Sequence, residues 1–142
     1  MSNGRRDTDY LDDMEHGIKK VITHLEGLDK EQFLRDEWTQ DAVVRNIEII
    51  GQAAKELSES TREMCPEVEW KKLMGMRDRL AHGYFAINLD VVWNTVQEDL
   101  PHLLVQVQGL QKQLSADETE RQERPSPSRV PPQRNKGQDY ER

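Results

Sequence analysis

An apolar stripe between residues 42 and 57 constrains the fold of this chain more than any other feature. Its members recur at alternating steps of four and three residues, which places their side chains on one face of an α-helix. They are Val43, Ile47, Ile50, Ala54 and Leu57. Gly51 lies within the stretch and, with the neighbouring alanines, permits the close approach of a second helix. The pattern predicts a helix from about residue 39 to about residue 58 that packs against other helices.

Three further stretches predict three more helices. Residues from 9 to Leu25 repeat apolar side chains at helical spacing and end before Gly27, where a C-terminal cap is expected. A third helix is expected to begin with Pro66 in its first turn, after a polar connection over residues 58–64, and to end near Gly83. A fourth, capped by Asn88 or Asp90, is expected to reach Leu114 with a kink at Pro101.

These elements predict an all-α fold, an up-and-down bundle of four main helices with one short extra helical turn. The extra turn is expected at residues 29–34, because Asp29-Lys30-Glu31-Gln32 resembles a capping box. The length of 142 residues suits one domain. We expect a flexible N-terminus at 1–8, a helical domain at 9–114 and a disordered tail at 115–142, since the tail holds four of the six prolines and few apolar residues.

Charge and cysteine content exclude several classes of protein. With a net charge of −7, the chain cannot coat nucleic acid through its overall field, so contact with RNA must rest on a local basic patch. The single cysteine, Cys65, excludes an intramolecular disulfide and a cysteine-rich zinc site. No apolar run approaches the roughly 20 residues that span a bilayer. The first residues lack the apolar core of a signal peptide, so we expect a cytoplasmic protein without a membrane partner.

Arg77 interrupts the apolar face of the third predicted helix. That face otherwise carries Trp70, Leu73, Leu80 and Tyr84 at helical spacing. A charge in this position needs a partner, or else it faces a cleft or a subunit interface. The structural alternative is a salt bridge to Glu48 or to another acid of the second helix. The functional alternative is phosphate binding, for which a guanidinium is well suited.

His82 completes the candidate site. Five residues along an ideal helix turn about 140°, so Arg77 and His82 converge only if the helix ends near Gly83 or if two chains contribute one residue each. Asp78 lies four positions before His82 and is expected to hold its ring by a hydrogen bond. Residues 71–82 carry four basic side chains against one acid, which indicates a local basic patch that could bind phosphate. Arg79 belongs to this patch and is expected to support the site.

Other side chains carry less chemistry. His16, His24 and His102 show no metal-ligand spacing, so neither a metal nor another cofactor is expected. The three tryptophans, at positions 38, 70 and 93, fit helix stripes or their edges and are expected to serve packing.

Several motifs of the sequence resemble those of a known family. Arg77-x4-His82-x-Tyr84 is similar to the RX4HXY motif of HepT-like toxins, which belong to the HEPN superfamily. Residues 42–55 resemble the second helix of that family. Trp70 with Gly75-Met76-Arg77, then Val92-Trp93 and Asp99-Leu100-Pro101, resemble its remaining signatures in the same order. The resemblance covers about residues 10–110.

The resemblance implies a metal-independent endoribonuclease that acts as the toxin of a toxin–antitoxin pair and cleaves RNA such as tRNA. It implies a homodimer whose active site lies where the motif helices of two subunits meet, and no DNA partner. Arg77 and His82 would be catalytic. Tyr84 would receive AMP from a minimal nucleotidyltransferase antitoxin.

Two departures from the family pattern keep an alternative open. Asp78 stands where a neutral polar residue commonly follows the arginine, and Gln52 stands where a glutamate is common. The alternative is a catalytically weak or inactive HEPN module that binds a nucleotidyltransferase partner or a nucleotide. A plain structural helical domain is the third interpretation.

Overall fold

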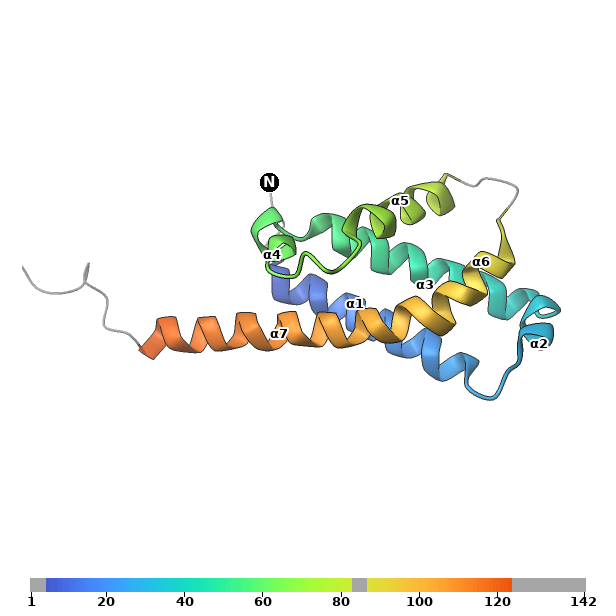
Figure 1. The fold of residues 1–142 in the computed structure, drawn as a ribbon, viewed down its shortest axis with the longest axis horizontal. Coiled ribbons are helices and arrows are strands. Elements are labelled where there is room, and N and C mark those ends of the chain that lie inside the picture. The colour runs from blue at the N-terminus through green and yellow to red at the C-terminus, as the bar shows by residue number, and fades with distance from the viewer. Residues whose placement is uncertain (1–4, 83–86, 124–142) are drawn as a thin grey trace, which may run out of the picture. The chain divides into compact units, whose positions relative to one another are not determined.

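The computed structural model describes residues 5–82 and 87–123, which form seven α-helices and one π-helical turn (Figure 1). In order these are α1 (Asp7–Leu25), α2 (Lys30–Leu34), α3 (Glu37–Glu56), α4 (Glu59–Glu63), α5 (Trp70–Ala81), α6 (Leu89–Asn94), the π-helical turn η1 (Thr95–Asp99) and α7 (Leu100–Glu123). These residues contain no strand, so the predicted all-α fold is confirmed.

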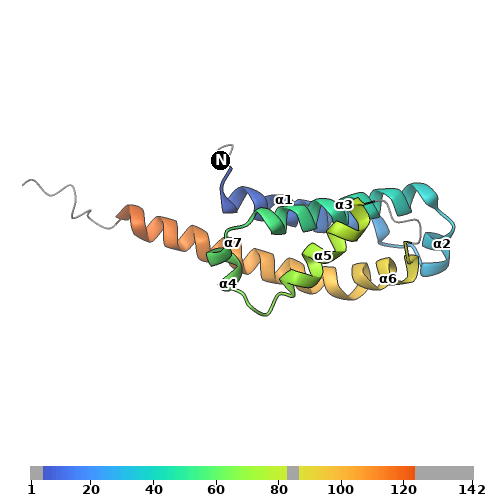
Figure 2. The same ribbon diagram turned by 90° about the horizontal axis from the view of Figure 1, so that it is seen from above.

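Four main helices form the bundle. Figures 1 and 2 show α1 and α3 side by side and running in opposite directions, and α5 packs on α3. The fourth helix is continuous through α6, η1 and α7. Its Gln108 and Gln111 donate side-chain hydrogen bonds to the Glu15 carboxylate of α1 at 3.0 and 3.1 Å. The up-and-down order predicted from the sequence is therefore confirmed.

The predicted apolar stripes supply most of the core. Side chains at helical spacing on α1, α3 and the fourth helix are almost fully removed from solvent, which is the main source of the bundle's stability. They include Leu11, Met14, Ile18, Val21, Val43, Ile47, Ile50, Ala54, Val92, Val96, Leu103, Val107 and Leu110. Phe33 of α2 is fully buried against the Trp93 ring, with centroids 5.4 Å apart.

Side-chain caps fix where several helices begin. The predicted capping box opens α2: the Gln32 backbone N–H donates to the Asp29 carboxylate at 2.8 Å, and the Asp29 N–H donates to the Gln32 side chain at 2.9 Å. Asn88, one of the two candidate caps, accepts hydrogen bonds from the first backbone N–H groups of α6. These caps satisfy donors that a helix start leaves without partners.

The segment between α3 and α5 differs from the expectation. Residues 59–63 form α4 rather than a polar connection, and Pro66 does not lie in the first turn of α5, which begins at Trp70. A residue before proline avoids the helical region, so α4 ends ahead of Cys65. Val68 is buried, and the Trp70 indole N–H donates to the carbonyls of Arg62 and Cys65, both at 3.0 Å. The chain therefore makes a turn before α5 starts.

Asp7 fastens the start of α1 to the start of α4. Its carboxylate accepts hydrogen bonds from the Ser58 backbone N–H at 3.0 Å, from the Ser58 hydroxyl at 2.6 Å and from the Thr61 hydroxyl. Burial raises the pKa of this carboxyl, but the hydrogen bonds from Ser58 and Thr61 outweigh it, and the net shift is downward. We call this contact the Asp7 clamp.

The predicted kink at Pro101 takes the form of a π-helical turn just before it. Pro101 has no backbone N–H, and its ring would press on the carbonyl four residues earlier, that of Gln97. Gln97 lies inside η1, so the wider turn provides the interruption that the proline requires.

Both ends of the helical region lie beyond the expected limits. The first helix begins at Asp7 rather than after residue 8. The last continues nine residues past Leu114, because the stretch from Ser115 to Glu123 contains good helix formers and neither proline nor glycine. The expectation of disorder is wrong for residues 115–123, and residues 124–142 lie outside the described part.

The chain divides into two units after Lys112. The described side chains of the second unit, at 113–120, are all exposed except the half-buried Leu114.

The tryptophans do not all serve packing. Trp93 packs on Phe33 and Trp70 is half-buried, but Trp38 is 87% exposed. Trp38 lies in the first turn of α3, next to the buried Thr39 but outside the stripe that faces the core.

Candidate functional site

Helix α5 carries the candidate residues, and a glycine sets how closely it lies to α3. A methyl group placed on Gly51 of α3 would lie 2.4 Å from the Arg77 Cβ and 3.1 Å from the Leu73 carbonyl oxygen. Non-bonded carbon atoms do not approach to 2.4 Å, so the two helices can pack at this distance only because residue 51 has no side chain. The close approach inferred from Gly51 is confirmed, and Arg77 lies directly on it.

Arg77 is partly accessible and does not form the salt bridge considered as its structural alternative. Its side chain is 27% exposed, and its NH1 donates to the carboxylate of the adjacent Asp78 at 3.0 Å. Glu48 pairs with Arg45 instead, at 3.2 Å. The expectation that a charge in this stripe faces a cleft fits the position of Arg77 better than a buried ion pair does.

Asp78 bridges two helices. Its Oδ1 accepts from Arg77 NH1 and also from Lys55 Nζ of α3, the latter at 3.1 Å. Lys55 and Arg77 together lower the pKa of the Asp78 carboxyl, with the hydrogen bond from Lys55 the larger cause. Asp78 is therefore an ionised carboxylate at neutral pH, held between two cations.

His82 is the C-terminal cap residue of α5 and is exposed. Its ring Nδ1 lies 2.5 Å from the backbone carbonyl oxygen of Asp78, so Nδ1 carries the proton in this contact. The ring is held by Asp78, as expected, but by the main chain rather than the carboxylate. The reason is geometric, because a carbonyl near a helix end points along the axis toward the residue four positions on. With the proton on Nδ1, the lone pair of the neutral ring lies on Nε2.

A groove of about 480 Å³ lies beside Arg77, between α1, α3 and α5. Three arginines, three acidic residues and one tyrosine are among the residues that line it. Its lining consists of Arg5, Tyr10, Asp13, Arg45, Glu48, Ile49, Gln52, Ala53, Glu56, Arg77 and Ala81. The Arg5 guanidinium stacks over the Tyr10 ring at 4.7 Å and pairs with Asp13 at 2.8 Å. The groove is balanced in charge, although the whole chain carries −7.

The structure separates residues that the sequence grouped together. His82 follows Ala81, the last α5 residue of the groove, but is not itself part of the described lining. Arg79 lines a different hollow of about 560 Å³, with Leu80, Ile87 and Val91. Tyr84 and Gly83 lie outside the described residues. The convergence of Arg77 and His82 in one opening of a single chain is therefore not observed.

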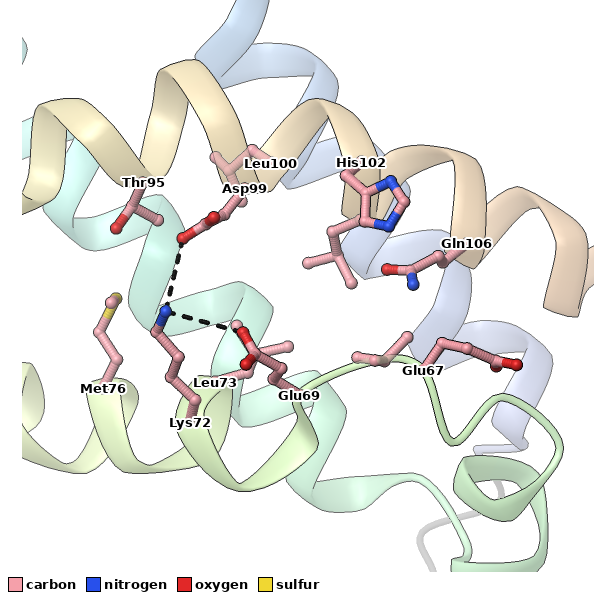
Figure 3. Close-up of a pocket in the computed structure, with 12 residues that line it drawn as sticks. Glu67, Glu69, Lys72, Leu73, Met76, Thr95, Asp99, Leu100, His102 and Gln106 are labelled. Atoms are coloured by element: carbon pink, nitrogen blue, oxygen red, sulfur yellow. Dashed lines mark ion pairs between the residues drawn. The ribbon is translucent and has the colours of Figure 1, made fainter.

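Lys72 belongs to a third hollow, on another side of α5 (Figure 3). This hollow has a volume of about 280 Å³, and in it Lys72 points toward Asp99 and Glu69, with ion pairs of 3.9 and 3.6 Å. Because each helical residue turns about 100°, the basic side chains of residues 71–82 are distributed around α5. The expectation of a single basic footprint over these residues is wrong.

Several residues that the structure brings to Arg77 were not predicted from the sequence. Lys55 and Arg45 belong to the helix that carries Gly51, and Arg5 and Tyr10 come from the start of the chain. A signal for Lys55 existed, since a residue four positions after Gly51 lies on the same helix face. No comparable signal in the sequence places Arg5 near Arg77.

Two further observations concern metal binding and membrane insertion. In the described part of the chain, no group of three or more His, Cys, Asp or Glu side chains has the geometry to hold a metal ion. Among the same residues, every helix is too short or too polar to cross a lipid bilayer.

Comparison with known proteins identifies the family. A probable ribonuclease HepT from Thermococcus cleftensis is 38% identical over 108 residues, which cover 76% of this chain and 98% of that protein. A protein of Caldanaerobacter subterraneus subsp. tengcongensis named "Putative RNase" is 38% identical over 101 residues, covering 71% and 90% of the two chains. A protein with the same description from Methanocaldococcus jannaschii is 32% identical over 109 residues, covering 77% and 90%.

No solved structure matches this chain. Residues 14–110 match the family described as Ribonuclease HepT-like, and this span contains α3, α5, and both Arg77 and His82. The expected resemblance is thus confirmed: the chain belongs to the HepT-like family of ribonucleases.

Proposed function

We propose that this chain is an endoribonuclease that cleaves RNA without a metal ion, with Arg77 binding the scissile phosphate and His82 transferring the proton. The observation that carries the proposal is the position of Arg77. Arg77 lies in the apolar stripe of α5, lines a groove and keeps its side chain 27% exposed while it pairs with Asp78. Membership of a ribonuclease family supports RNA as the substrate.

The reaction uses the 2′-hydroxyl of RNA as an internal nucleophile. The 2′-oxygen forms a bond to phosphorus while its proton passes to a base, and the bond from phosphorus to the 5′-oxygen breaks. The departing 5′-oxygen takes up a proton, which leaves a 2′,3′-cyclic phosphate and a 5′-hydroxyl. Nε2 of His82 suits the proton transfers, and Arg77 suits the charge that develops on the phosphate oxygens.

Two copies of the chain would bring these groups together. Within one chain, His82 lies outside the described lining of the Arg77 groove. Beside the end of α5, Ile87 and Val91 are 37% and 48% exposed and line an open apolar hollow together with Leu80. A second copy placed against this face would cover these side chains and add its own His82 and Arg77. We therefore propose a homodimer with a shared site.

The resemblance extends the proposal to regulation. The chain would act as the toxin of a toxin–antitoxin pair, with an RNA such as tRNA as its target. A minimal nucleotidyltransferase antitoxin would add AMP to Tyr84, two residues after His82. The added phosphate would compete for Arg77 and occupy the space that RNA needs. Tyr84→Phe should then escape modification, as mass spectrometry of the co-expressed pair would show.

The activity is tested with purified protein and total cellular RNA in the presence of EDTA. The parental chain should produce 5′-hydroxyl ends, and Arg77→Ala and His82→Ala should each reduce the rate on the order of 10²-fold or more. His16→Ala and Arg35→Ala are matched controls, because both side chains are exposed and lie outside the groove. Parental rates in both site variants, with contaminating nuclease excluded, would refute the assignment.

A second candidate function rests on Asp78. A carboxylate that accepts a hydrogen bond from Arg77 competes with phosphate for that guanidinium, which suits a catalytically silent module that binds a nucleotidyltransferase or a nucleotide. In that case the chain would bind its partner or AMP with a measurable Kd, and RNA would remain intact in the EDTA assay.

A further inference from the structure

One carboxylate oxygen of Asp78 accepts hydrogen bonds from both Lys55 and Arg77. Asp78 Oδ1 accepts from Lys55 Nζ at 3.1 Å and from Arg77 NH1 at 3.0 Å. Lys55 comes from α3, whereas the other two residues are neighbours on α5. Lys55 and Asp78 are 23 residues apart in the chain, so their ion pair links two helices and does not form within one helix turn.

The close approach at Gly51 brings Lys55 within reach of Asp78. Gly51 and Lys55 are four residues apart on α3 and lie one above the other on the same face. The Arg77 Cβ lies directly over Gly51. One turn further along α3, the Lys55 side chain meets Asp78. The backbone contact and the ion pair therefore place α5 at two successive turns of α3.

The charges of these three residues show what Lys55 contributes. Arg77 and Asp78 alone sum to zero, so a phosphate that binds the guanidinium would lie beside a carboxylate with no second cation to offset it. With Lys55 the group carries a net charge of +1. Arginine has five N–H donors, and the contact with Asp78 engages NH1. The remaining donors are available for a bidentate contact with phosphate.

We propose that Lys55 is a positioning residue of the site, which neutralises Asp78 and thereby keeps Arg77 available for the RNA phosphate. The proposal rests on the proposed function, in which Arg77 binds that phosphate. Asp78 fixes the orientation of the guanidinium, and Lys55 prevents Asp78 from opposing the substrate. It follows that Lys55 is required only while residue 78 is an acid.

A double-mutant cycle tests this dependence. The variants are Lys55→Met, Asp78→Asn and the two combined, and the readout is the initial rate of 5′-hydroxyl formation in total RNA at low and at saturating concentration. Lys55→Met should lower the rate at low RNA roughly fivefold, the scale of one partly exposed charge pair. Most of this loss should appear in KM. Adding Asp78→Asn to Lys55→Met should return the rate to within about twofold of Asp78→Asn alone.

Matched controls separate this role from a structural one. Lys30 pairs with Asp90 at 2.9 Å, also between two elements and with similar partial exposure, but it lies away from the groove. Lys30→Met should lower Tm about as much as Lys55→Met without changing the rate. Lys55→Arg, which keeps the charge, should cleave RNA at nearly the parental rate. Equal rates in Lys55→Met and Lys30→Met would overturn the proposal, as would an effect of Lys55→Met that is unchanged by Asp78→Asn.

A binding measurement keeps the two proposals distinguishable. The Kd for a single-stranded RNA oligonucleotide, measured across the same cycle, should show the same fivefold loss and recovery even if cleavage is slow. If the parental chain binds RNA with this coupling but does not cleave it, the proposed catalysis is wrong and the role of Lys55 stands. If the parental chain cleaves RNA and Lys55→Met has no effect on rate or Kd, the role of Lys55 is wrong and the catalysis stands.

Discussion

Replacing Gly51 by alanine tests whether the contact between α3 and α5 places Arg77. Alanine favours a helix interior by about 1 kcal/mol over glycine, so propensity alone predicts a gain in stability. The new methyl group, however, would lie 2.4 Å from the Arg77 Cβ and 3.1 Å from a backbone oxygen. Neither neighbour is the far end of a flexible side chain, so relief requires that α5 move.

The size of the effect follows from these two terms. Overpacking of a tight contact destabilises by about 1–3 kcal/mol. Taking the upper value, because the contact involves the backbone and a Cβ atom, we expect a net loss of about 2 kcal/mol after the gain in propensity. The displacement of α5 should also slow RNA cleavage, because Arg77 and the Lys55 contact both depend on the position of that helix.

Gly109→Ala is the matched control, since Gly109 lies within α7 and a methyl group there would meet no atom within 4 Å. It should gain about 0.5–1 kcal/mol. Urea denaturation followed by circular dichroism should therefore separate the two variants by about 3 kcal/mol in the free energy of unfolding. If Gly51→Ala is as stable as Gly109→Ala and cleaves RNA at the parental rate, α3 does not place Arg77 as described.

Two further predictions concern the bundle itself. Hydrogen bonds from Gln108 and Gln111, then from Lys19, lower the pKa of Glu15 to about 2. A depressed carboxyl pKa stabilises the fold above the unfolded value near 4.5, so this contribution should fade as the pH falls from about 4.5 toward 2, and Glu15→Gln should flatten that part of the profile of Tm against pH. Phe33→Ala should lower the free energy of unfolding by about 3–5 kcal/mol in urea denaturation, since it empties a fully buried site; a loss below 1 kcal/mol would contradict the packing described.

The helices of the bundle were predictable because their signal is local. The stripes of α1 and α3, the capping box at Asp29 and the small residue at Gly51 are all patterns within one helix. The elements that the sequence misplaced depend on contacts with distant residues. The start of α5 is one example, because burial of Val68 and the hydrogen bonds of the Trp70 indole decide where the chain turns.

The candidate site shows the same division. The exceptional position of Arg77 is visible in the spacing of α5, and the structure places that side chain at a groove. Its ionic partner was not predictable, because it depends on which acids the neighbouring helices bring close. Glu48 lies on the expected helix but pairs with Arg45, whereas Asp78 joins Arg77 to Lys55. The spacing of apolar residues thus indicated Arg77, whereas tertiary packing determined its ionic partner.

The Asp7 clamp limits where the chain can be shortened. Its carboxylate holds the hydroxyls of Ser58 and Thr61, which are more than fifty positions away. Removal of residues 1–5 would leave Arg6 as the helix cap and keep the clamp intact. Removal of residues 6 and 7 as well would delete Asp7, so the first turn of α1 and the start of α4 would lose the hydrogen bonds that join them. An affinity tag or fluorophore is therefore best attached ahead of residue 5.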